Sequence, residues 1–325
     1  MEQHIPGIVL TQPVFDYKRC LFEKVYVETP VDTDGDGRLD LIAVYIRRPL
    51  ETTQGMRVPA IYVANPYMLE CNEDWYVPHD VDRDVSPYPQ QHITESDITF
   101  DPSTVSFPQP RYPRATVGYA DTAPTEEIPL DCISDWYSYF NSRGYASVFC
   151  GGLGTRGSQG FNCCGSPEET AAFKAVIDWL NGRCRAFTNL TDNIEIRADW
   201  CTGKVAMSGK SYLGTMCIAV ASTGVEGLET IIPEAAISNW YDYYRCNGLN
   251  LPAIGWQGDD LDILAKYCFS RAKDPEDYAS VREAYAAWLE GIAADEDRDS
   301  GNYSRWWDMR NYLKAADRFK ASVFL

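Results

Sequence analysis

Hydrophobic and polar residues alternate along the chain in a pattern that predicts successive strands and helices. Residues 22–28 alternate apolar with polar side chains, and residues 39–46 are rich in apolar and β-branched types, with an aspartate and glycine run between them. The two segments therefore predict a β-hairpin. Further strands are predicted at 58–64, 145–150 and 230–238, and helices at 131–143 and 167–180.

The remaining segments divide the chain into a core and additions to it. Residues 68–129 are rich in proline, acidic and aromatic residues and show no sustained period, so they predict a long surface excursion. Helical repeats predict that residues 246–316 form a helical cap inserted between two late strands. Residues 1–245 would then form the core, and residues 317–325 would begin a further core strand, whose last residues are predicted to be buried.

One segment, residues 204–214, predicts a catalytic serine. A small apolar strand runs into Gly209-Lys-Ser211 and is followed at once by a helical pattern, which places Ser211 on a sharp turn. Such a turn lifts the hydroxyl above the sheet edge, where a histidine can take its proton and a helix N-terminus faces the oxyanion. The usual hydrolase turn has a glycine two residues after the serine, whereas here Leu213 stands there and Gly214 follows. A glycine-rich strand end with a serine N-cap is the alternative.

Five segments carry a resemblance to a known family. They are residues 31–42 (VDTDGDGRLDLI), 64–67 (ANPY), 154–158 (GTRGS), 209–214 (GKSYLG) and 237–245 (ISNWYDYYR). In them the chain resembles the X-prolyl dipeptidyl-peptidase and cocaine-esterase family of serine hydrolases, and most closely the X-prolyl dipeptidyl-peptidases. The resemblance implies an α/β-hydrolase fold with a central, mostly parallel sheet. It also implies a triad in which aspartate and histidine follow the serine.

The same resemblance implies roles for five further residues. It implies that the Tyr67 hydroxyl and the Tyr212 N–H bind the oxyanion and that Trp240 and Tyr243 hold a proline ring. Asp259, where we expect glutamate in the family, would pair with the free amine of the substrate. From the residues alone, the tyrosine after Pro66 is also typical of a packed surface aromatic, and the later aromatic pair is typical of a core beneath helices. The aspartate is equally typical of a charged first helical turn.

The histidines do not fit the triad order. His4, His79 and His92 all precede Ser211, and no histidine follows it. His79 and His92 fall in the surface excursion, where we expect solvated loop histidines. Because the chain stops within the predicted late strand, we expect a fragment or one product of a split gene.

Composition limits the partners of the chain. Its 325 residues carry 47 acidic and 29 basic side chains, a formal charge of −18. A nucleic acid or an anionic membrane would repel this charge, whereas a cationic peptide N-terminus would be attracted. No signal-peptide pattern or bilayer-spanning run is present, which predicts a cytoplasmic protein with no membrane partner. The eleven cysteines are scattered and predict mostly reduced core thiols, and a bridge between Cys163 and Cys164 would be strained.

Two other motifs suggest ligands but fit them poorly. Gly152, Gly154 and Gly157 have the spacing of a dinucleotide-binding loop, yet the predicted helix begins several residues later. Residues 32–37 resemble the start of a calcium loop, but Ala43 stands at the twelfth position, where a glutamate is needed. We therefore predict a turn at residues 32–37, no metal and no organic cofactor.

These observations favour the catalytic core of a serine exopeptidase that releases Xaa-Pro dipeptides from proline-containing peptides through an acyl-enzyme on Ser211. An ester or amide hydrolase of the same superfamily, acting on small acyl substrates, is the first alternative. An inactive fragment, or one half of a split enzyme, is the second. A homodimer is compatible with the sequence, which does not determine the oligomeric state.

Overall fold

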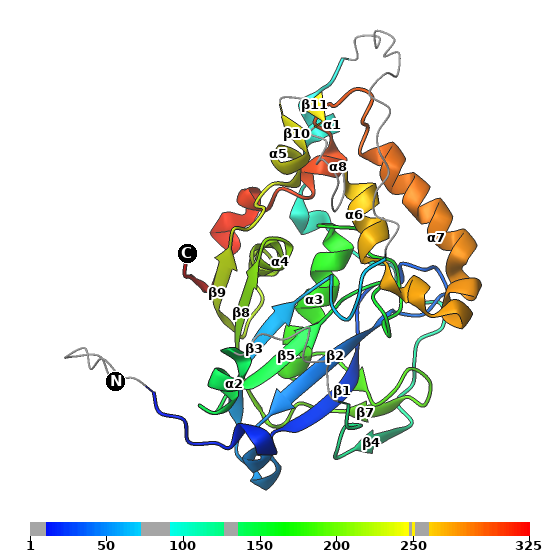
Figure 1. Ribbon diagram of the computed structural model, residues 1–325. Coiled ribbons are helices and arrows are strands. Elements are labelled where there is room, and N and C mark those ends of the chain that lie inside the picture. Colours follow the sequence, from blue (N-terminus) through cyan, green and yellow to red (C-terminus); the bar gives the residue numbers. More distant parts are fainter. Residues whose placement is uncertain (1–10, 73–91, 127–135, 247–248, 251–259) are drawn as a thin grey trace, which may run out of the picture.

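The computed structural model describes residues 11–72, 92–126, 136–246, 249–250 and 260–325. One large sheet lies at its centre (Figure 1). Ten strands form this sheet, in the spatial order β12-β9-β8-β3-β5-β2-β1-β6-β7-β4. The strands are β1 (Leu21–Glu28), β2 (Leu41–Arg48), β3 (Val58–Ala64), β4 (Gly118–Ala120), β5 (Ala146–Cys150), β6 (Ala186–Phe187), β7 (Ile194–Ile196), β8 (Cys201–Lys210), β9 (Leu228–Glu234) and β12 (Ser322–Val323). A separate ribbon pairs β10 (Arg245–Cys246) with β11 (Leu249–Asn250).

Helices connect most of these strands. They are α1 (Glu95–Ile98), α2 (Trp136–Asn141), α3 (Pro167–Leu180), α4 (Tyr212–Ala221), α5 (Trp240–Tyr244), α6 (Leu261–Cys268), α7 (Pro275–Asp295) and α8 (Arg305–Asp308). Short 3-10 segments are η1 (Tyr17–Arg19), η2 (Leu50–Gln54), η3 (Pro102–Thr104), η5 (Ser270–Lys273) and η6 (Tyr312–Arg318). No described helix is both long enough and apolar enough to cross a membrane.

The strand order identifies the fold class. Strands β12, β9, β8, β3 and β5 are mutually parallel, whereas β2 runs antiparallel to both β5 and β1. Along the chain, the seven strands from one end of the sheet to β1 are β1, β2, β3, β5, β8, β9 and β12. Across the sheet, starting from β1, they lie in the order first, second, fourth, third, fifth, sixth and seventh. This order, with an antiparallel second strand and a serine turn after the fifth, is that of the α/β-hydrolase fold. The predicted fold class and N-terminal hairpin are thus confirmed.

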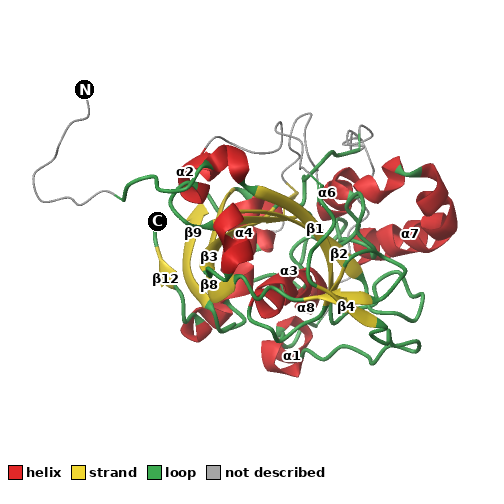
Figure 2. Cartoon of the chain, turned by 90° about the horizontal axis from the view of Figure 1, so that it is seen from below, coloured by secondary structure: helices red, strands yellow, loops and turns green. Residues whose placement is uncertain are grey.

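Successive side chains of a strand point to opposite faces of the sheet. The two faces bury hydrophobic clusters of very different size. Tyr62 of β3 and Val148 of β5 belong to the main core, which α3 and α4 cover. Their neighbours Val63 and Phe149 belong to a much smaller cluster on the other face. Viewed from below, the sheet is strongly curved, and α3 and α4 lie within the molecule (Figure 2).

Two predicted segments differ in detail from the structure. The strand predicted at 230–238 is β9, which ends at Glu234 because Ala235 takes a positive φ of 46° and turns the chain. The surface excursion contains an unpredicted strand, β4, which pairs with β7 at the sheet edge. A three-residue strand is too short to show a hydrophobic period, so only its pairing reveals it.

The end of the chain also differs from the prediction. Residues Ser322–Val323 form β12 and pair in parallel with β9, as a late strand should. However, both residues are exposed, and Phe324 and Leu325 beyond them are 70% and 95% exposed. In this structure the strand is present, but its residues lie exposed at the end of the sheet and are not buried as predicted.

Between β9 and β12 the chain forms α5 to α8, so the helical segment does interrupt two late strands. Figure 1 shows α5, α6 and α8 beyond the ends of β8 and β9, at the end of the sheet where α4 begins, and α7 along the right side of the molecule. This placement brings residues after β9 toward the serine turn.

Candidate active site

Ser211 occupies the predicted turn between β8 and α4. Its backbone has φ 59° and ψ −121°, a strained conformation for a residue other than glycine. Its N–H donates to the Glu234 carbonyl of β9 at 2.8 Å, and its own carbonyl accepts the Thr215 N–H at 2.8 Å. The side chain is exposed at the sheet edge. A strained, exposed serine at this position is the arrangement of a hydrolase nucleophile.

Two glycines make this tight turn possible. A Cβ on Gly209 would lie 2.4 Å from the Leu213 Cβ, and a Cβ on Gly214 would lie 2.7 Å from the Gly209 carbonyl oxygen. The backbones of β8 and α4 therefore meet at Gly214. This contact explains why the second glycine of the motif stands one residue later than usual, while Leu213 is tolerated in its place.

Two hydrogen-bond donors were predicted for the oxyanion. The Tyr212 N–H belongs to the first turn of α4, whose amides have no acceptor within the helix. Tyr67 follows β3, and the loop after the third strand supplies the second donor of a hydrolase oxyanion hole. The Asn65 side chain accepts the Tyr67 N–H at 3.1 Å and so shapes this loop.

Contacts between rings place Tyr67 beside the serine turn. Its ring meets the Tyr212 ring edge-on at 5.7 Å, and it lies 6.0 Å from Tyr267 of α6. Burial raises the pKa of Tyr67 well above its usual value. The phenol keeps its proton at neutral pH, as an unperturbed tyrosine also does, and can donate a hydrogen bond.

The predicted aromatic pair lies on α5. Asn239 caps this helix by accepting the Tyr241 N–H at 3.2 Å. Trp240 has no exposed surface, because Tyr212 packs edge-on against it at 5.0 Å and Tyr244 stacks on it at 6.2 Å. Tyr243 is 54% exposed and lies 6.3 Å from Trp240. Of the pair, only Tyr243 is open to a ligand in this structure.

Asp259 lies outside the described residues, but the next residue is informative. Asp260 is fully buried, caps α6 and forms ion pairs with Arg245 at 2.8 Å and Arg298 at 3.1 Å. Burial, reinforced by Asp260 and a second aspartate, raises the pKa of nearby Glu296 to about 10. Because the Asp260 carboxylate is fully buried and forms two ion pairs, it stabilises the interior and is not open to a ligand.

Among the described residues, no histidine forms a hydrogen bond with the serine hydroxyl. His4 and His79 lie outside them, and His92 is exposed just before α1. Within the described part of the chain, no hydrogen bond is formed by the Ser211 hydroxyl.

Sequence reasoning missed a buried acid beneath the serine turn. The Tyr212 hydroxyl donates to Glu169 of α3 at 2.7 Å, and Glu169 is only 2% exposed. Two acids after Ser166-Pro167 look like an ordinary helix start. Nothing in that pattern indicates that the second of them is buried.

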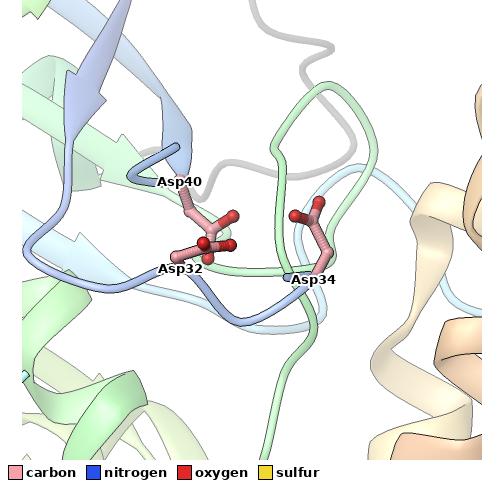
Figure 3. A group of neighbouring side chains, drawn as sticks. All are labelled: Asp32, Asp34 and Asp40. Carbon is pink, nitrogen blue, oxygen red and sulfur yellow. The ribbon is translucent and has the colours of Figure 1, made fainter. Parts of the chain in front are cut away.

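The acidic turn between β1 and β2 gathers three carboxylates, Asp32, Asp34 and Asp40, with oxygens within 4.8 Å of one another (Figure 3). Asp32 accepts the N–H groups of Gly35 and Gly37, which makes the predicted turn. Asp34 forms an ion pair with Arg271 at 2.7 Å. Burial raises the pKa of Asp40 to about 8. These contacts serve the turn and its junction with η5.

The predicted glycine-rich loop follows β5 and likewise serves packing. Gly152 and Gly154 have positive φ, and added Cβ atoms there would lie 2.6 Å from Phe173 and 2.9 Å from Phe269. Helix α3 starts at Pro167, ten residues beyond Gly157. The loop does not open onto a helix N-terminus as a dinucleotide fingerprint requires.

Comparison with known proteins finds a matching family and similar relatives. A family model described as "X-Pro dipeptidyl-peptidase (S15 family)" matches residues 34–325. The Xaa-Pro dipeptidyl-peptidase of Pediococcus pentosaceus is 44% identical over 316 residues, which cover 97% of this chain and 38% of the relative. That of Lactiplantibacillus plantarum is also 44% identical, over 97% of this chain and 38% of the relative. The chain thus spans well under half the length of these curated relatives.

Two solved structures align with the chain at lower sequence identity than these relatives. A CocE/NonD family hydrolase from Staphylococcus aureus aligns over 98% of this chain and 46% of its own, with 14% identity and a TM-score of 0.47. An alpha-amino acid ester hydrolase aligns over 99% of this chain and 44% of its own, with 15% identity and a TM-score of 0.44.

Proposed function

Because the chain belongs to the X-Pro dipeptidyl-peptidase (S15) family, we propose that it forms the nucleophile-bearing part of a serine exopeptidase. This enzyme would release Xaa-Pro dipeptides from the N-termini of peptides. The observation that supports the proposal most is Ser211, exposed and held at positive φ between a central parallel strand and a helix.

In the proposed reaction the Ser211 Oγ attacks the carbonyl carbon after proline, and a general base takes the hydroxyl proton. The resulting oxyanion accepts hydrogen bonds from the Tyr212 N–H and the Tyr67 hydroxyl. Collapse of this intermediate breaks the C–N bond, and the shortened peptide leaves as an amine that receives the proton. Water then hydrolyses the acyl-enzyme, which releases the dipeptide and restores the serine.

The base and its carboxylate partner are not assigned to any described residue of this chain. No histidine follows Ser211, and the relatives are more than twice as long as this chain. The activity is therefore proposed for the full-length protein, in which residues 246–316 form a cap over the serine.

The substrate contacts follow the aromatic and acidic residues near the site. Tyr243 is proposed to contact the proline ring, with Trp240 supporting it from behind. Asp259 is proposed to pair with the substrate ammonium. Nine described cysteines are free thiols, seven of them buried, which favours the reducing cytoplasm as the site of action.

The test measures hydrolysis of glycyl-prolyl p-nitroanilide and of p-nitrophenyl acetate by the full-length protein. We expect a strong preference for the Xaa-Pro amide and a loss of roughly 10⁴-fold or more in kcat in Ser211→Ala. Ser222→Ala, at the other end of α4, is the matched control and should keep its activity. Full activity of Ser211→Ala would refute the nucleophile, and ester hydrolysis without amide cleavage would favour a small-acyl hydrolase.

A further inference from the structure

A closed circuit of buried contacts lies beneath the serine turn. The Tyr212 hydroxyl donates to Glu169 Oε1 at 2.7 Å, and Glu169 Oε2 accepts the Gly165 N–H at 2.6 Å. The Gly165 carbonyl accepts the Tyr312 hydroxyl at 2.8 Å, and the Tyr312 oxygen in turn accepts the Trp240 indole N–H at 3.1 Å. The Tyr212 ring packs edge-on against Trp240, which closes the circuit.

This circuit has little room to move. Gly165 has φ 74°, and a Cβ there would lie only 2.2 Å from the Trp240 indole nitrogen. The four side chains of the circuit are between 0% and 6% exposed. Arg310 holds the preceding loop by donating to the Cys164 carbonyl and the Cys163 sulfur, both at 2.9 Å.

Glu169 is the member of the circuit whose burial costs free energy, because its carboxylate loses its hydration. Burial raises its pKa to about 7, against the hydrogen bonds from Tyr212 and Gly165 and the nearby Arg310, which lower it. The start of α3 does not need this buried acid, because Glu168 already places a partly exposed carboxylate in the same turn. A carboxyl buried at a cost calls for another explanation. Among the described residues, the titratable and charged groups that face it are Tyr212, Tyr312, Arg310, Cys163, Cys164 and Cys268.

We propose that Glu169 is a positioning residue that joins the oxyanion donor to the substrate pocket. By accepting both the Tyr212 hydroxyl and the Gly165 N–H, it fixes the first residue of α4 and, through Tyr312, the Trp240 indole that supports Tyr243. The Tyr212 N–H and the pocket wall are thereby set as one rigid unit. This inference rests on the proposed function for its catalytic consequence, and on the contacts alone for its structural consequence.

The structural consequence is tested on the chain itself by hydrogen exchange of peptides that cover residues 209–215. In Glu169→Gln the amide can still accept one hydrogen bond but not both, and in Tyr212→Phe the donor is lost. Both variants are expected to exchange several-fold faster in this segment than the wild type. Glu168→Gln removes the same charge one residue earlier and should exchange like the wild type. Equal exchange in all four proteins would overturn the inference, whatever the activity.

The catalytic consequence is tested on the full-length protein with glycyl-prolyl p-nitroanilide. We expect kcat, counted per site titrated with a fluorophosphonate, to fall roughly 10- to 100-fold in Glu169→Gln and Tyr212→Phe. KM should change less, and the double variant should lose no more than either single one, because both break the same hydrogen bond. Wild-type kcat in Glu169→Gln would overturn the inference and leave the proposed function standing. An inactive wild type would instead refute the proposed function.

Discussion

Tyr67 combines burial with a chemical task at the scale of one residue. Its ring packs against Tyr212, and its hydroxyl can donate a hydrogen bond. Packing and hydrogen bonding can therefore be separated by removing one oxygen atom. Packing and hydrogen bonding cannot be separated in this way at Trp240. Its indole N–H donates to Tyr312, and its ring is fully buried.

Tyr67→Phe is expected to lower kcat for glycyl-prolyl p-nitroanilide by about 10²- to 10³-fold, because one oxyanion donor is lost while the ring packing remains. KM should change much less. Tyr139→Phe removes an exposed hydroxyl from α2 and is the control. An unchanged kcat would show that Tyr67 is a packing residue only.

Asp259→Asn is expected to raise KM for peptides with a free N-terminus, because the substrate ammonium loses its charged partner. Peptides whose N-terminus is acetylated provide the comparison, since they carry no ammonium. Equal losses for both kinds of peptide would count against a role in amine binding.

At the scale of elements, two helical glycines have opposite surroundings. A Cβ on Gly214 of α4 would meet two backbone carbonyl oxygens at 2.7 and 2.8 Å, whereas a Cβ on Gly291 of α7 would meet nothing within 4 Å. Gly214→Ala is expected to lower the free energy of unfolding by about 1–3 kcal/mol through overpacking. Gly291→Ala should raise it by about 0.5–1 kcal/mol through helix propensity. Urea unfolding of the chain measures both, and a neutral Gly214→Ala would contradict the close contact of β8 with α4.

Elements defined by local pattern were predicted well. The hairpin of β1 and β2, strand β3 and helix α3 each have their own hydrophobic period or cap, and their bounds lie within a few residues of the prediction. Elements defined by pairing were not. β4 exists because it meets β7, and the exposure of β12 depends on what covers the sheet edge.

At the scale of the whole molecule, three buried carboxyls make stability depend on pH. Burial is the main cause that raises the pKa values of Asp40, Glu169 and Glu296, to about 8, 7 and 10. The folded chain therefore holds protons that the unfolded chain has released above about pH 4. Their contribution to stability is complete below that pH and is lost as the pH rises through the folded values.

Asp40→Asn is expected to flatten the fall in unfolding free energy between pH 5 and pH 8. The asparagine oxygen can still accept the Thr33 N–H but does not titrate. Asp36→Asn, exposed in the same turn, should leave the slope unchanged. Urea unfolding at several pH values measures the slope. An unchanged slope in Asp40→Asn would show that this carboxyl is not held protonated by the fold.

The sequence by itself determined the order of the longer strands and helices, the serine turn and the positions of Tyr67, Tyr212 and Tyr243 near strand ends. These features follow from local periods, caps and glycines, which act over a few residues. Only the tertiary structure decided that Trp240 is enclosed, that Glu169 lies under Tyr212, and that Asp34 pairs with Arg271. The last two contacts join residues 43 and 237 positions apart. Burial and pairing of this kind depend on which distant segments meet, and no local pattern carries that information.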